Sequence, residues 1–201
     1  RGSGAERQGL KNLVSQVLGG SRSSRLDKRL VFQDKLADSV SAFAWGSELG
    51  GLFIVQADVK QGVDPAKVEA ALDEELNKLI ATGPTEAELA QAKTVIEAGF
   101  VRGIERIGGF GGKADVLAEC AVFTGDPACY AKTLSVIEQS TVKDIQATAA
   151  EWLNSGDYTL TVVPGERKPV VEAPAIKDLK PSVIPPADPK FTTVPSTVDR
   201  S

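Results

Sequence analysis

The residue types that most often carry hydrolytic chemistry are scarce in this chain. It has no histidine, so it lacks both the usual general base of serine and cysteine hydrolases and the commonest zinc ligand. Its only thiols are Cys120 and Cys129, whose spacing fits neither a zinc ribbon nor a Cys-x-x-Cys motif. We therefore predict no catalytic residue and no metal ligand in this chain, and its substrate-binding residues stay unassigned.

The two cysteines allow two interpretations. Ordinary buried or partly buried thiols are favoured, because no imidazole is available to pair with either one. A disulfide between them would suit an oxidising compartment, but spacing alone does not establish one. A self-sufficient cysteine or carboxylate enzyme would need a base close to Cys120 or a close pair of acids, and the sequence shows neither in a convincing context.

A glycine-rich run, Gly108-Gly109-Phe110-Gly111-Gly112, could in principle cradle a phosphate. The segment before it is predicted to be a helix rather than a strand, and Lys113 is followed by Ala114 instead of Ser or Thr. We therefore favour a corner between two helices.

Composition indicates an ordinary globular protein. Of 201 residues, 42% are hydrophobic and 25% charged, and the net charge is −4 with no run of Lys or Arg. Nucleic acid is therefore not expected as a partner, nor is a membrane, since no apolar stretch could cross one. The chain contains no methionine, which predicts that it is a piece of a longer protein.

Hydrophobic periodicity predicts which elements must position any site. Residues 10–18 follow a helical period that ends at Gly19-Gly20, and Leu26 to Val31 suggest a second short helix. Period-two runs at Ser39–Trp45 and Leu52–Val59 predict an antiparallel hairpin. Another such run, Tyr158–Val163, predicts a strand that joins it.

Between the hairpin and that last strand the pattern is helical throughout. Asp64-Pro65 begins one helix, and Thr85 with Glu88 forms a capping box for a long helix to about Ile107. Three shorter helices follow: one with an apolar stripe, one opened by Asp126-Pro127, and one capped by Thr141 with Asp144. The predicted stripe consists of Ala114, Leu117, Ala118 and Ala121.

The fold class predicted from this order is α+β, a mainly antiparallel sheet with helices packed on one face. Residues 1–163 form the predicted non-catalytic domain. Residues 164–201 are rich in proline and show almost no apolar periodicity, so they are predicted to be a linker or tail.

Several stretches together resemble the second domains of pitrilysin/insulinase family zinc metallopeptidases. One is the segment from Leu18 to Leu26, with its Leu-Gly-Gly and Ser-Ser-Arg-Leu, followed shortly by Arg29-Leu30. Other pieces follow in the order of that family over about Leu10 to Pro164: Gly51-Leu52-Phe53-Ile54, the Gly83–Leu89 corner, Glu105-Arg106 and Thr159–Pro164.

The resemblance implies an enzyme whose halves, each of two similar α+β domains, close around a peptide. Zinc would be held in a neighbouring domain by an inverted His-x-x-Glu-His motif, which is absent here. The partner half of that family commonly carries a substrate-holding Arg and Tyr, and the matching positions here are Val31 and Asp38. The resemblance therefore implies the second domain of the zinc-bearing half, with the tail leading to the partner half.

The function that follows is a non-catalytic wall of a peptide-enclosing chamber, in which a neighbouring zinc domain performs proteolysis. The chain alone would be inactive and its parent a zinc metalloendopeptidase. Its partners would be the other domains of that peptidase and a peptide substrate, and resemblance to bacterial secreted members suggests the periplasm. The alternative is a catalytically inactive scaffold or assembly subunit of the same fold.

Several charged and tryptophan residues are expected to have structural rather than ligand-binding roles. Arg25 is expected to cap helix carbonyls or pair with a local acid. The acidic residues Glu86, Glu88 and Glu105 are expected to be solvated helix charges. Both tryptophans, Trp45 and Trp152, are expected in the core or on a sheet face.

Overall fold

The computed structural model describes residues 4–46 and 50–166. The chain divides into two units, Arg1–Thr161 and Val162–Ser201, and the elements below all belong to the first. Of the predicted linker or tail, residues 164–201, the structure describes only residues 164–166.

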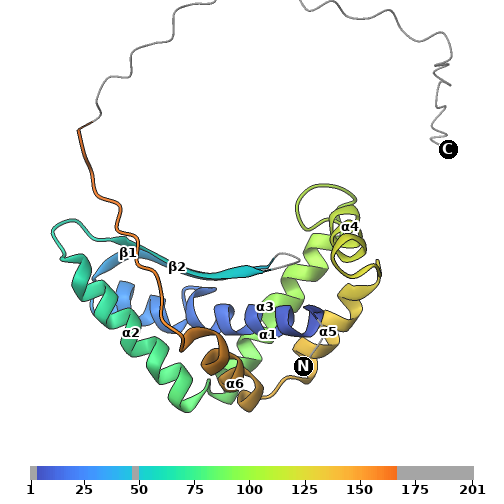
Figure 1. The fold of residues 1–201 in the computed structure, drawn as a ribbon, viewed down its shortest axis with the longest axis horizontal. Helices are drawn as coiled ribbons and strands as arrows, with labels where there is room; N and C mark the ends of the chain where they lie inside the picture. Colours follow the sequence, from blue (N-terminus) through green and yellow to red (C-terminus); the bar gives the residue numbers. More distant parts are fainter. Residues whose placement is uncertain (1–3, 47–49, 167–201) are drawn as a thin grey trace, which may run out of the picture. The chain divides into compact units, whose positions relative to one another are not determined.

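The order of elements follows the predicted α+β pattern (Figure 1). Helix α1 is followed by a π-helical turn η1, a β-hairpin and a run of five helices. Their bounds are α1 Gly4–Gly19, η1 Asp27–Gln33, β1 Ala37–Gly46, β2 Gly51–Val59, α2 Pro65–Thr82, α3 Glu86–Ile104, α4 Lys113–Thr124, α5 Cys129–Gln139 and α6 Val142–Leu153.

The hairpin pairs β1 and β2 antiparallel, with Ala42 opposite Val55 and Trp45 opposite Leu52. Its register shifts between Ala37 and Ser39, so Asp38 is the extra residue of a bulge. Side chains alternate between the two faces along each strand. The face that carries Ala42 packs on α1 and is buried, while the opposite face is exposed at Trp45.

Helix α1 lies at the centre of the folded unit, where it contacts β1, α3, α5 and α6. Its apolar residues therefore face neighbours on several sides, and Leu13 and Leu18 are completely buried. Figure 1 shows the helices on one side of the hairpin. The remaining large side chains of the core with almost no exposure are Val14, Leu26, Leu30, Leu79, Ile137 and Ile145.

Predicted helix starts are confirmed at three places. The Asp64 carboxylate accepts a hydrogen bond from Ala66 N at 3.0 Å, and Pro65 occupies the first turn. The capping boxes of Thr85 with Glu88 and of Thr141 with Asp144 are both complete. These hydrogen bonds satisfy amide groups that the helix itself leaves without partners.

Three predictions about elements are wrong. Helix α3 ends at Ile104 rather than near Ile107. The predicted stripe of α4 does not form a buried face: Ala114, Leu117, Ala118 and Ala121 are all exposed, and Cys120 is buried instead. Residues 158–163 form no strand, because within the described residues no neighbouring strand pairs with them. The Thr159 hydroxyl instead bonds Glu69 of α2 at 3.0 Å.

No helix in residues 4–46 and 50–166 combines the length and the apolar character that crossing a membrane requires.

Candidate functional site

One closely hydrogen-bonded polar group is a clamp made by Arg25, Glu88 and the carbonyl of Gly83. Arg25 Nε donates to Glu88 Oε1 and Nη2 donates to Oε2, both at 2.8 Å, so the pair is bidentate. Nη2 also donates to Gly83 O at 2.9 Å, at the end of α2. The clamp therefore joins the start of the π-helical segment to the corner between α2 and α3.

Glu88 serves two structures at once. Its Oε2 accepts hydrogen bonds from Thr85 N at 2.7 Å and Thr85 Oγ1 at 3.1 Å, which close the capping box of α3. The side chains of Arg25 and Glu88 are 14% and 24% exposed, so solvent screens the pair only in part. The hydrogen bond from Arg25, together with those from Thr85, lowers the pKa of Glu88 to about 2.

This geometry confirms one expectation and corrects another. Arg25 does bond a carbonyl at a helix end, as expected, but the acid that pairs with it, Glu88, is 63 positions away rather than local. Glu88 is not a solvated helix charge, because α3 turns it toward Arg25 of a segment far away in sequence. The capping box gave a signal for the position of Glu88, but no sequence signal identified its second partner.

An open hollow of about 470 Å³ lies beside the clamp. Arg25, Lys28, Arg29 and Lys78 bring positive charge to it, and among the described residues acids pair with all of these except Lys28. Arg29 Nη2 bonds Glu74 at 3.0 Å, and Lys78 Nζ bonds Glu75 at 2.7 Å. Such mutually paired charges favour a structural role over capture of an anion.

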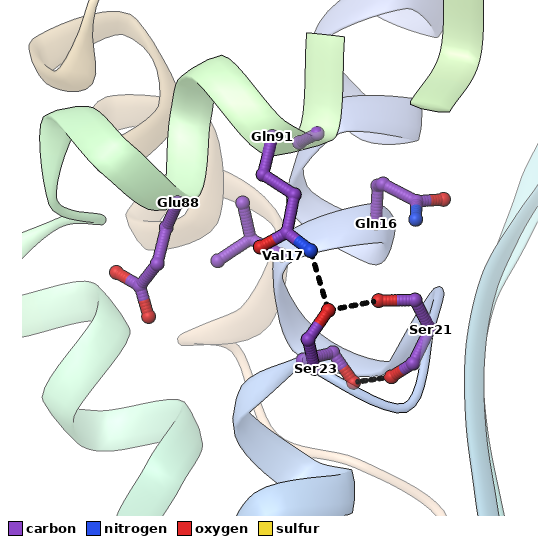
Figure 2. A pocket seen from close by; sticks show the side chains of 8 residues that line it. Gln16, Val17, Ser21, Ser23, Glu88 and Gln91 are labelled. Atoms are coloured by element: carbon purple, nitrogen blue, oxygen red, sulfur yellow. Dashed lines mark hydrogen bonds between the residues drawn. The ribbon is translucent and has the colours of Figure 1, made fainter. Parts of the chain in front are cut away.

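A second pocket, shown in Figure 2, lies between the end of α1, the Ser21–Ser24 turn and α3. Ser23 Oγ accepts a hydrogen bond from Gln91 Nε2 and bonds Ser21 Oγ at 3.0 Å. The cavity measures only about 10 Å³, enough for about one water molecule. The hydrogen bonds around this cavity connect the Ser21–Ser24 turn to α3.

The two positions that the family resemblance aligns with a substrate-holding Arg and Tyr, Val31 and Asp38, lie on either side of the start of β1. Val31 belongs to η1 and packs half-buried against the core. Asp38 is exposed at the bulge of β1. A valine side chain makes no hydrogen bond, and a carboxylate only accepts, so neither can replace the donors of an Arg or a Tyr hydroxyl.

The outer face of the hairpin is apolar near its tip. Phe43 lies opposite Ile54 and Trp45 opposite Leu52, and Trp45 is 65% exposed. Trp45 was expected in the core or on a sheet face. It lies on the exposed face of the hairpin and not in the core. Trp152 is also exposed, and Lys11 Nζ lies 3.7 Å from its ring centroid.

Cys120 and Cys129 form a disulfide between the end of α4 and the start of α5. The favoured interpretation as ordinary thiols is therefore wrong. In the described ranges, 4–46 and 50–166, no group of three or more Cys, Asp or Glu side chains could hold a metal ion. The absence of catalytic and metal-binding residues from this chain stays a prediction.

Three comparisons with known proteins bear on this fold. The family model for the peptidase M16 inactive domain matches residues 2–96. Among solved structures, the inactive peptidase domain of a "putative zinc protease" from Bordetella parapertussis is 23% identical with a TM-score of 0.64, covering 75% of this chain and 79% of that one. No curated protein matches the chain.

Two further solved structures share the fold. A "putative zinc protease" from Bordetella pertussis Tohama I is 23% identical with a TM-score of 0.63, and the match covers 74% of this chain and 79% of the other. A protease from Helicobacter pylori is 22% identical with a TM-score of 0.64. That match covers 74% of this chain but only 35% of the Helicobacter chain, which is thus considerably longer.

Proposed function

We propose that this chain, whose residues 2–96 match the family model for the peptidase M16 inactive domain, forms the non-catalytic wall of a proteolytic chamber. A zinc-bearing domain, in the same polypeptide or in a partner, performs the cleavage, and the enclosed substrate is a peptide. The observation that carries the proposal is the match to an inactive peptidase domain in a chain without a single histidine.

The positions Val31 and Asp38 support a more specific assignment. Neither side chain can make the hydrogen bonds of the substrate-holding Arg and Tyr that the resemblance places there. We therefore assign the chain to the half of the enzyme that also holds zinc, and the Arg/Tyr pair to the other half. Residues 1–163 are proposed as the domain and residues 164–201 as the linker.

The Cys120–Cys129 disulfide supports an extracytoplasmic location. Disulfides persist in oxidising compartments such as the bacterial periplasm and are rare where thioredoxin and glutathione keep thiols reduced. The periplasm is therefore the compartment that we propose.

The proposal makes a direct prediction about the gene. The complete reading frame, or the gene of a protein that co-purifies with this chain, should encode His-x-x-Glu-His in a domain of the same fold, and the other half should carry the Arg/Tyr pair. Sequencing of the locus and mass spectrometry of co-purified proteins test both statements. A complete locus without the motif, and no zinc protein among the co-purified partners, would contradict the protease proposal and favour the scaffold.

A further inference from the structure

Helix α4 is attached to the rest of the domain in an unusual way. Of its residues, all of which the structure describes, only Cys120 is buried, and Val122 is 71% exposed. It packs mainly on α5, and Figure 1 shows it at the opposite side of the helices from α2. The apolar burial that normally holds a helix on its domain is therefore small for α4.

Helix α5, in contrast, is anchored at both ends. Tyr130 stacks on Phe100 of α3 with ring centroids 5.8 Å apart, next to Cys129. At the other end, Ile137 is completely buried against α1, and Lys93 Nζ of α3 donates to Ser140 O at 2.7 Å. The disulfide thus joins a loosely packed helix to a firmly packed one.

Glycines flank α4 on both sides. The loop before it contains Gly109 and Gly111 with φ of +82° and +72°, and Gly125 with φ of +72° ends it. Open space surrounds the Cβ position of each of the three, and the loop before α4 is held mainly by hydrogen bonds, such as that from Lys113 N to Arg106 O at 2.9 Å. Such positions can absorb the changes in φ and ψ that a moving element requires.

From this arrangement we propose that the Cys120–Cys129 disulfide is a redox latch: it holds α4 on α5, and its reduction releases α4 while the rest of the domain stays folded. The latch does not depend on the proposed function, because it rests only on the packing of α4 and α5. It would make the position of α4 respond to the redox state of the compartment.

The reductant is a dithiol, either a small molecule or a thioredoxin-like protein. One thiolate attacks a sulfur of the protein disulfide, forms a mixed disulfide and releases one cysteine thiolate. The second thiol of the reductant then displaces the other cysteine. Two electrons and two protons pass to Cys120 and Cys129, which become thiols, and the dithiol becomes a disulfide.

The test is amide hydrogen exchange of the whole chain, oxidised and after treatment with dithiothreitol, with thiol alkylation to count reduced cysteines. Reduction should accelerate exchange of the α4 amides roughly 10- to 100-fold, because the cross-link no longer limits opening. The amides of α1 and α6 should keep their protection. A C120S/C129S variant should show the fast α4 exchange without reductant.

Either of two exchange results would overturn the latch, as would resistance of the disulfide to reduction. One is unchanged α4 exchange in both the reduced chain and the C120S/C129S variant, which would show that packing alone holds the helix. The other is loss of protection in α1 and α6 together with α4, which would make the disulfide a requirement of the whole fold. A disulfide that resists dithiothreitol in the folded chain would also contradict a redox-responsive latch.

Discussion

Replacing Gly19 with alanine should destabilise the domain by about 3 kcal/mol, the upper part of the range for overpacking a tightly filled site. Gly19 is the last residue of α1 and lies directly against β1. A Cβ there would lie 2.6 Å from Ala42 N and 2.9 Å from Ser41 C, both backbone atoms that cannot rotate away. Helix and hairpin would have to separate, and the core between them would open.

The sign of this effect is informative. Alanine normally stabilises a helix relative to glycine by about 1 kcal/mol, so propensity alone predicts the opposite result. Urea denaturation followed by circular dichroism measures the difference. The matched control is Gly20→Ala, whose Cβ would meet only the end of the Gln16 side chain, which can move. Equal stability of the two variants would contradict the close approach of α1 to β1.

Replacing Arg25 with alanine should cost about 2–3 kcal/mol at neutral pH, because it leaves a partly buried carboxylate and the Gly83 carbonyl without their donor. The loss should also depend on pH. The pKa of Glu88 is about 2 in the folded chain and roughly 4.3 in an unfolded one. The ionised Glu88 carboxylate therefore adds its full share to the free energy of unfolding above about pH 4.5. This share declines as the pH falls toward 2.

Unfolding free energies at pH 7 and pH 3 provide the measurement. The native chain should lose stability between these values, and Arg25→Ala should lose less, since the hydrogen bond from Arg25 is the main cause of the lowered Glu88 pKa. The control is Arg29→Ala, which removes an arginine twice as exposed as Arg25 from ion pairs with Asp34 and Glu74 and should cost much less. Identical pH dependence in native and Arg25→Ala chains would contradict the clamp.

Local signals in the sequence were sufficient for the starts of α2, α3 and α6, but α5 begins at Cys129 rather than at the Asp126-Pro127 that was expected to open it. A capping box involves residues three apart, such as Thr85 and Glu88, so its geometry depends on one turn of chain. The hairpin was equally accessible, because alternation and the intervening glycines specify it locally. The α+β fold and the family resemblance rest on such pieces in their order.

Features that depend on distant partners could not be predicted. Arg25 and Glu88 lie 63 positions apart, and neither carries a local sign of the other. The alternation of apolar and polar residues at 158–163 is typical of a strand. A strand forms only when a neighbouring strand pairs with it, and the sequence pattern does not show whether one does. The apolar residues of α4 fit a helical stripe, yet no element covers that stripe among the described residues.

The central claim is that this domain takes part in proteolysis without supplying the catalyst. It is tested by hydrolysis of a fluorescence-quenched peptide by this chain alone with added zinc, and by its assembly with the zinc-bearing domain found at the same locus or by co-purification. The account predicts no turnover by the chain alone, since it has no imidazole ligand, and turnover by the assembly that a chelator abolishes. Zinc-dependent turnover by this chain alone, or an assembly that is inactive with zinc bound, would contradict it.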